Sequence, residues 1–294
     1  MIIVAGEALV DLVPDHVGGY RPVPGGSPAN TAVGLGRLGT QTALLARLAN
    51  DHLGTLLRTN LETSNVDLRH VAESTAPTTL AVVDIDRHGT ADYSFYIDGC
   101  ADGGWQPTDL PTTLPPDAAL HIGGSFALTI EPMAATFDTL LTREHPHRVT
   151  TLDPNIRPTL ITDPDTVRAR LRRWLGMVDV VKVSTDDLRW IAPDRPLTDV
   201  VAEWHDHGPT LVVVTRGAEG VHASGPTGTI DLPALPVDID DLLTRTAPTT
   251  LTHTELTDVL TYAQRVAAIT CTRPGADSPW FDELLPEEVR TPTC

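Results

Sequence analysis

Short apolar runs alternate with helical segments along most of this 294-residue sequence. The first run, Ile2–Ala5, is apolar throughout and ends at Gly6, which is typical of a strand buried on both faces of a parallel sheet. We expect further strands at Thr42–Leu48, Ala118–Gly123, Thr150–Asp153, Val178–Val183 and Leu211–Thr215. We expect helices at about 131–143, 163–175, 197–207 and 256–270. The last would pack with one side, which carries Val259, Tyr262, Ala263, Val266, Ala267 and Thr270. Because strands and helices in this order form βαβ units, the sequence predicts an α/β fold with a mainly parallel sheet.

A glycine-rich turn precedes the first predicted helix, where residues 24–30 read Pro-Gly-Gly-Ser-Pro-Ala-Asn. Gly25 and Gly26 allow a tight turn and a close approach of the backbone to a ligand. Ser27 is a favoured N-cap residue, and the proline after it would be the first residue of the helix. Free N–H groups at this helix start, with Asn30 in its first turn, suit a polyhydroxy ligand. The same turn is also typical of a helix that only packs close to a strand, and both interpretations stay open.

Residues 78–98 have a different pattern, which predicts two strands joined by a glycine-containing turn. Such a hairpin would form a small antiparallel sheet apart from the parallel core and act as a lid. Tyr93 and Phe95 alternate with Ser94, so they share one face of that sheet. We expect them either to pack the small sheet or to form an apolar cover for a sugar ring. Residues 9–23 are turn-rich and predict a short excursion away from the core.

Polar and charged residues stand at the ends of three predicted strands, at Asp153, Lys182 and Thr215. In an open α/β sheet, ligands bind at the carboxyl ends of the strands. Phosphoryl transfer requires positive charge around the moving phosphoryl group, and Arg157, Lys182 and Arg216 are placed to supply it. A surface ion pair is the alternative explanation for each of these cations.

The net charge of −18 argues against nucleic acid and anionic membranes as partners. The three cysteines show no metal-ligand spacing, and we expect a reducing, cytoplasmic location. No apolar stretch has the length that a membrane-spanning helix requires. The chain length suits one large α/β domain, alone or with a small second domain.

Several stretches in a fixed order together give the sequence a family resemblance: 1–11, 24–36, 48–54, 153–158, 181–187 and 215–220. They resemble the ribokinase-like (PfkB) family of sugar and nucleoside kinases, most of all its bacterial fructokinase branch. The resemblance implies a three-layer αβα fold in a single domain over residues 1–294, with lid segments inserted at about 12–24 and 78–99. It also implies phosphoryl transfer from ATP to a sugar hydroxyl group, with Mg²⁺ and, as a further candidate, K⁺. A nucleoside kinase of the same fold is the alternative.

The resemblance also implies roles for matching residues. A sugar would contact Asp11, Gly25, Gly26 and Asn30, to which the patterns above add Tyr93, Phe95 and Arg157. ATP would contact Lys182, Ser184, Thr215, Arg216, Gly217 and Gly220. Ser184 and Asp187 stand where the family has an Asn-x-x-Glu motif that organises Mg²⁺, so Asp187 is the metal candidate despite this departure from the pattern. The family's lid sheet sometimes forms a dimer contact, which makes a homodimer an open expectation.

One family motif, Asp-Thr-x-Gly-Ala-Gly-Asp before a small-residue helix, has no counterpart here. In the family it supplies an anion hole and the catalytic Asp, and it would follow Ile239, yet no glycine occurs from Thr229 to Pro274. The catalytic residue is therefore unassigned, with Asp240 or Asp241 as candidates. Either the protein is an inactive sugar- or nucleotide-binding homologue, or the chain as printed leaves out a loop and helix. We favour the second explanation, because deleting a central helix would expose apolar core at roughly 25 cal/mol per Å².

Overall fold

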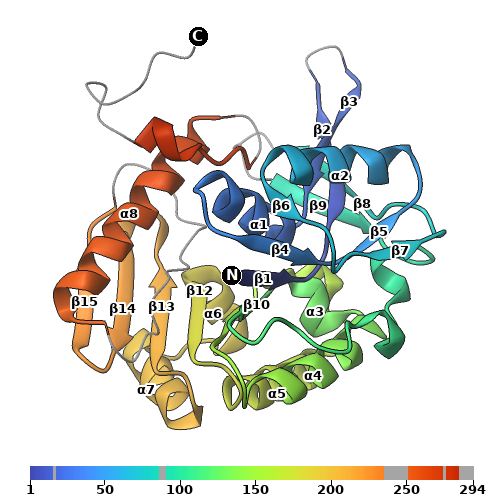
Figure 1. The fold of residues 1–294 in the computed structure, drawn as a ribbon. Coiled ribbons are helices and arrows are strands. Elements are labelled where there is room, and N and C mark those ends of the chain that lie inside the picture. The colour runs from blue at the N-terminus through green and yellow to red at the C-terminus, as the bar shows by residue number, and fades with distance from the viewer. Residues whose placement is uncertain (16–17, 86–90, 235–250, 274–275, 285–294) are drawn as a thin grey trace.

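The computed structural model describes residues 1–15, 18–85, 91–234, 251–273 and 276–284. Its largest element there is a nine-stranded sheet with the order β15-β14-β13-β12-β11-β10-β1-β4-β6 (Figure 1). The strands are β1 Ile2–Ala5, β4 Thr42–Leu45, β6 Val66–Asp67, β10 Ala119–Gly123, β11 Thr150–Asp153, β12 Val180–Ser184, β13 Leu211–Thr215, β14 Val221–Gly225 and β15 Gly228–Leu232. Only the β13–β14 and β14–β15 pairs of this sheet are antiparallel, so the predicted mainly parallel sheet is confirmed.

Helices cover both faces of this sheet because its central strands present apolar side chains in both directions. On β1, Ile3 and Ala5 pack in the core formed with α3, α4, α5 and α7, whereas Ile2 and Val4 pack with α1 and α2. α8 covers the β13–β15 end on the same side as α1 (Figure 1). The helices are α1 Ser27–Arg37, α2 His52–Thr63, α3 Ser125–Thr129, α4 Met133–Glu144, α5 Pro164–Leu175, α6 Thr185–Ile191, α7 Leu197–His207 and α8 His253–Cys271. The three-layer αβα arrangement implied by the resemblance is confirmed.

The predicted helix at 256–270 is α8, but its packed side was partly wrong. Leu256 and Leu260 face the strands, whereas Tyr262, which we expected on the packed side, is 39% exposed. The leucines bury the apolar surface that the sheet offers, and this orientation turns the tyrosine outward. None of the helices in the described ranges has both the length and the apolar character needed to cross a bilayer.

A second sheet of four strands, which we call the small sheet, has the order β3-β2-β8-β9. Its strands are β2 Leu9–Pro14, β3 Tyr20–Gly25, β8 Leu80–Ile85 and β9 Ala91–Tyr96. β2–β3 and β8–β9 pair antiparallel, and β2–β8 pair parallel. The predicted small sheet is confirmed, and the stretch 9–23, expected to leave the core, contributes to two of its strands, β2 and β3, which the sequence did not predict. The turn of the predicted hairpin falls within residues 86–90, outside the described residues.

The predicted strand Thr42–Leu48 is divided in two. β4 stays in the large sheet, whereas β5 Arg47–Ala49 pairs in parallel with β7 Ala72–Ser74. The division falls at Ala46, whose carbonyl oxygen accepts a hydrogen bond from Ala72 N–H at 2.9 Å. The stretch predicted as one strand therefore supplies strands to two different sheets. The local sequence pattern gives no sign of this division.

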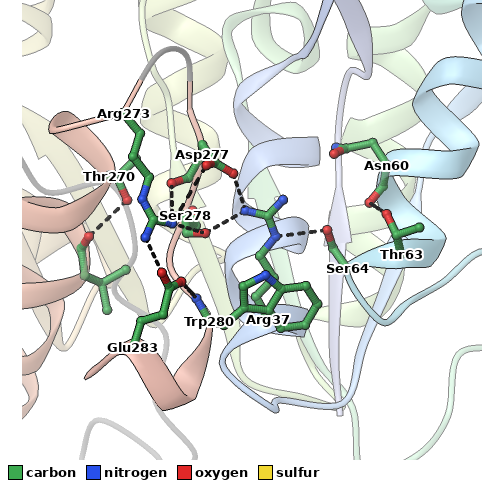
Figure 2. A network of polar contacts seen from close by, with 11 residues as sticks. Arg37, Asn60, Thr63, Ser64, Thr270, Arg273, Asp277, Ser278, Trp280 and Glu283 are labelled. Atoms are coloured by element: carbon green, nitrogen blue, oxygen red, sulfur yellow. Dashed lines mark hydrogen bonds and ion pairs between the residues drawn. The ribbon is translucent and has the colours of Figure 1, made fainter. Parts of the chain in front are cut away.

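The last described segment, 276–284, is attached to α1 by Arg37, whose side chain is only 13% exposed. Arg37 Nη1 lies 2.6 Å from Asp277 Oδ1 and donates to the Ser278 carbonyl oxygen at 2.6 Å. The guanidinium carbon lies 5.5 Å from the centre of the Trp280 ring. Figure 2 shows these groups gathered around Arg37, between α1 and the segment. The Arg37 side chain thus holds the segment 276–284 against the first helix.

Replacing Arg37 with alanine is expected to lower the free energy of unfolding by about 2 kcal/mol and Tm by about 5 °C. The variant loses the contacts above and a hydrogen bond from Arg37 Nε to Ser64 Oγ at 3.1 Å. Denaturant titration and thermal unfolding would measure both quantities. Arg69→Ala is the control, because Arg69 is 61% exposed in its pair with Asp67, so its removal should leave the free energy of unfolding nearly unchanged. Equal stability of the two variants would contradict the attachment.

Candidate functional site

The segments that follow β1, β10 and β11 line a cavity of about 360 Å³, together with α1, α8 and the small sheet. We call it the roofed cavity, because the small sheet covers it. Six of the seven predicted substrate-binding residues line it: Asp11, Gly26, Asn30, Tyr93, Phe95 and Arg157. The structure therefore brings Asp11, Asn30 and Arg157 together as expected, while their binding roles stay predictions.

Gly25, the seventh predicted residue, does not line the cavity but packs against Asp11. A Cβ atom at Gly25 would lie 2.2 Å from Asp11 Oδ2, so glycine leaves room for the carboxylate. At Gly26, φ is +94° and a Cβ atom would lie 2.7 Å from the Glu7 carbonyl oxygen. The glycine pair thus lets β3 approach β2 closely and lets α1 begin beside the cavity.

The start of α1 differs from the prediction at Ser27. Gly26 is the N-cap residue, and Ser27 is the first residue of the helix. Ser27 Oγ accepts a hydrogen bond from Asn155 Nδ2 at 2.8 Å. The predicted capping role was wrong because a distant residue uses the hydroxyl group. Asn155 has a φ of +39°, in the left-handed region that Asn tolerates better than most residues, and so turns the chain after β11.

Tyr93 and Phe95 lie together on the wall of the roofed cavity. Their rings are stacked, with centroids 5.9 Å apart and planes inclined by 15°, which confirms the predicted shared face. Phe95 also meets Phe126 edge-on at 5.6 Å, and the Arg157 guanidinium lies 5.9 Å from the Tyr93 centroid. Phe95 therefore packs on the core, whereas Tyr93 contacts a cation at the cavity.

Asp11 is an acidic group of this cavity, in the middle of β2 and opposite Val23 of β3. Burial raises the pKa of Asp11 to about 6, and the positive charge of Arg157 opposes that rise. Asp11 is therefore mostly ionised at neutral pH and can accept hydrogen bonds. A carboxylate, the Asn30 amide and a guanidinium in one cavity supply the acceptors and donors that a polyhydroxy ligand requires.

A second cavity, of about 560 Å³, lies at the carboxyl ends of β12 and β13, and we call it the strand-end cavity. Every residue predicted to bind nucleotide or metal lines it: Lys182, Ser184, Asp187, Thr215, Arg216, Gly217 and Gly220. Asn155 and Arg157 line both cavities. These two residues therefore mark the place where ligands in the two cavities would meet.

The turn that follows β13 is closed by a hydrogen bond from Arg216 N–H to the Gly220 carbonyl oxygen at 2.7 Å. Gly217 and Gly220 have φ values of +54° and +92°. A Cβ atom at Gly220 would lie 2.0 Å from the Leu232 carbonyl oxygen. Only glycine fits there, so this turn depends on the close approach of β15.

Two of the three predicted phosphate-binding cations have acidic partners. Lys182 Nζ lies 3.0 Å from Asp153 Oδ2, and Arg216 Nη2 lies 2.8 Å from Asp231 Oδ1. Both cations therefore form ion pairs, although the Lys182 pair is largely buried and not a surface pair, and both also line the strand-end cavity. Arg157 makes no ion pair with any residue in the described ranges.

Asp187 caps helix α6, because its Oδ2 accepts hydrogen bonds from the Ser184 N–H at 3.0 Å and from the Ser184 hydroxyl at 2.7 Å. Its Oδ1 accepts from Ile156 N–H at 2.7 Å. Burial raises the pKa of Asp187, and the negative charge of Asp153 adds to this effect. A carboxylate has about four lone-pair positions, so roughly one remains for a metal ion. Over the described residues, no group of three or more His, Cys, Asp or Glu side chains could hold one alone.

Sequence reasoning missed several residues that line the two cavities: Glu7, Ser27, Ser125, Asn155 and Gln264. Asn155 lies within stretch 153–158, which carries part of the family resemblance, so the sequence did offer a reason to expect it at the site. Gln264 is on α8 and gave no signal, because its position depends on how that helix packs. The catalytic residue stays unassigned, since Asp240 and Asp241 fall within residues 235–250, outside the described ranges.

Two adjacent cavities at the carboxyl ends of parallel strands are the arrangement expected of an enzyme with two small substrates. The sequence matches the family described as pfkB family carbohydrate kinase over residues 1–241. The chain therefore belongs to the pfkB family, and the predicted enzyme class, a carbohydrate kinase, is confirmed. The match ends near the point where the missing motif would begin.

Individual relatives agree with this assignment. The fructokinase of Rhizobium leguminosarum bv. trifolii is 41% identical over 231 residues, which cover 77% of this chain and 70% of the relative. The fructokinase of Salmonella typhimurium is 33% identical over 291 residues, which cover 93% and 94%. The crystal structure of fructokinase from Vibrio cholerae O395, in its fructose-, ADP- and calcium-bound form, has a TM-score of 0.81 and 27% identity, with 94% of each chain covered. The chain is thus similar to fructokinases in both sequence and fold.

Proposed function

We propose that this protein transfers a phosphoryl group from ATP to a hydroxyl group of a ketohexose such as fructose. The observation that carries the proposal is the junction of the two cavities at Asn155 and Arg157, where a sugar and a nucleotide would meet. Fructokinases at 33–41% identity support a sugar as the acceptor. The alternative of a nucleoside kinase is not better supported.

In the roofed cavity, Asp11 and Asn30 would form hydrogen bonds with sugar hydroxyl groups, and Gly25 and Gly26 would keep the backbone close to the ligand. Tyr93 and Phe95 would cover the apolar face of the ring. At the junction, Arg157 would place positive charge beside the transferring phosphoryl group, where charge develops in the transition state.

In the strand-end cavity, the phosphates of ATP would lie near Lys182, Ser184 and the turn of Thr215, Arg216, Gly217 and Gly220. Mg²⁺ is usually held by one or two carboxylates together with substrate phosphates. Asp187 fits as one such ligand, through its remaining lone pair, for a metal ion that neutralises phosphate charge. The same proposal includes a role for K⁺, assembly as a homodimer and a cytoplasmic location. It also includes a single domain with lid segments at about 12–24 and 78–99.

ADP formation by the purified full-length protein, with ATP, Mg²⁺ and a panel of sugars, tests this function. We expect sugar-dependent release of ADP, greatest with a ketohexose. Calorimetric titrations with the sugar and with Mg²⁺–ATP would accompany the assay. Binding of both ligands without ADP formation would identify an inactive homologue, as the missing motif allows, and would overturn the proposed kinase activity.

Replacing Lys182 with methionine is expected to raise the KM for ATP about tenfold, because the variant loses a charge-assisted contact to phosphate. Sugar binding should stay unchanged, since Lys182 lines only the strand-end cavity. Initial rates at varied ATP and varied sugar would separate the two effects. Lys182→Arg keeps the charge opposite Asp153 and should remain within about threefold of the wild type. An unchanged KM for ATP in Lys182→Met would contradict the proposed phosphate contact.

A further inference from the structure

Glu7 is a buried acid at the roofed cavity that no part of the proposed mechanism uses. It lies between the end of β1 and the start of β2, lines the cavity, and is only 5% exposed. Its Oε2 atom has no hydrogen-bond partner, and Glu7 forms no ion pair within the described residues. A buried polar atom without a partner is uncommon in folded proteins and calls for an explanation.

The surrounding backbone packs closely against this carboxyl group. A Cβ atom at Gly124, just before α3, would lie 2.0 Å from Glu7 Oε2 and 2.1 Å from Oε1. Gly124 has a φ of +87°, which other residues rarely adopt, so glycine is favoured there on two grounds. The Glu7 carboxyl group is thus packed against the backbone at Gly124 and almost hidden from solvent, in the lining of the cavity.

Burial, more than the charges around it, favours the neutral form of Glu7. Burial raises the pKa of Glu7 to about 8; Asp102 and Asp153 add to the rise, whereas Arg157 opposes it. At pH 7 the group is therefore mostly a carboxylic acid, with a proton to donate. Asp102 is buried nearby with a pKa of about 7, and its Oδ2 atom also has no hydrogen-bond partner, but Asp102 does not line the cavity.

We propose that Glu7 is a further sugar-binding residue, which donates a hydrogen bond from its neutral carboxyl group to one hydroxyl oxygen of the bound sugar. The inference rests on the proposed function, because it takes the roofed cavity as the sugar site. Asp11 accepts hydrogen bonds in the same cavity, so the two acids have opposite roles. A donor on one side and an acceptor on the other select how a hydroxyl-rich ring is oriented.

The test compares Glu7→Gln and Glu7→Leu with the wild type, using calorimetric titration with fructose at pH 7 and pH 9. Glutamine keeps a neutral donor at every pH, whereas leucine has none. Because ionised Glu7 cannot donate, wild-type affinity should fall about tenfold between the two pH values. Glu7→Gln should change less than about threefold, and Glu7→Leu should be about tenfold weaker than the wild type at pH 7. Asp84→Asn changes an exposed acid of the small sheet outside the cavity and should behave as the wild type.

Thermal unfolding and ATP titration of each variant establish that it is folded. The comparison of wild type with Glu7→Gln stands even where Glu7→Leu does not fold. An equal pH dependence in wild type and Glu7→Gln overturns the role of Glu7 while leaving the proposed function intact. A wild-type protein that binds ATP but no sugar at pH 7 overturns the proposed function and this inference together.

Discussion

Replacing Asp11 with alanine is expected to lower kcat/KM for the sugar about a thousandfold and to leave the KM for ATP within about twofold. A carboxylate that accepts hydrogen bonds from two sugar hydroxyl groups loses both in the variant, and each charge-assisted bond contributes about 1.5–3 kcal/mol. Asp11 lines only the roofed cavity, so nucleotide binding should not change. Initial rates with each substrate varied in turn would measure both effects.

The matched control is Asp84→Ala, an exposed acid on β8 of the same small sheet. It should leave both KM values unchanged. Asp11→Asn, which retains a single carbonyl acceptor, should fall between alanine and the wild type. If Asp11→Ala raised the two KM values equally, the carboxylate would be supporting the small sheet through its contact with Gly25 rather than binding sugar.

Replacing Arg157 with alanine is expected to lower kcat about a thousandfold, because the guanidinium at the junction would stabilise charge that develops only in the transition state. A second effect follows from electrostatics. Arg157 lowers the pKa of Asp11, which burial raises to about 6, so its removal should raise that pKa further. Since sugar capture needs ionised Asp11, the acid limb of kcat/KM should move to higher pH in the variant.

A pH profile of kcat/KM from pH 5 to 9 would measure this shift. Arg157→Lys keeps the charge and should restore the acid limb, with partial recovery of kcat. Arg195→Ala is the control, because Arg195 pairs with Glu203 away from both cavities. If the acid limb of Arg157→Ala lay at the same pH as that of the wild type, Arg157 would have no effect on the pKa of Asp11.

The sequence predicted the elements that depend on local pattern. The bounds of Thr150–Asp153 and Leu211–Thr215 agree with β11 and β13, because continuous apolar runs between turn residues have few other ways to be buried. Lys182 and Thr215 of the strand-end cavity were also predictable, since they stand near the carboxyl ends of neighbouring parallel strands, whereas Gln264 of the same cavity was not.

The errors occurred where distant contacts override local pattern. Ser27 looks like a helix cap, but Asn155 approaches it from the end of β11 and takes its hydroxyl group. The turn-rich stretch 9–23 gave no strand prediction, yet it contributes to β2 and β3, because β8 offers an edge on which β2 can pair. Tyr262 has the spacing of a packed residue, but the leucines of α8 decide which side faces the sheet.

The amino-acid sequence alone determined the α/β class, the order of most strands and helices, and the strand ends that carry Asp153 and Thr215. Each of these features depends on residues that are close together in the sequence. Only the tertiary structure decided which residues share a cavity and which ionisation state they hold. Glu7 shows the reason: an exposed glutamate ionises near pH 4.5, and burial among residues far away in the chain raises its pKa to about 8.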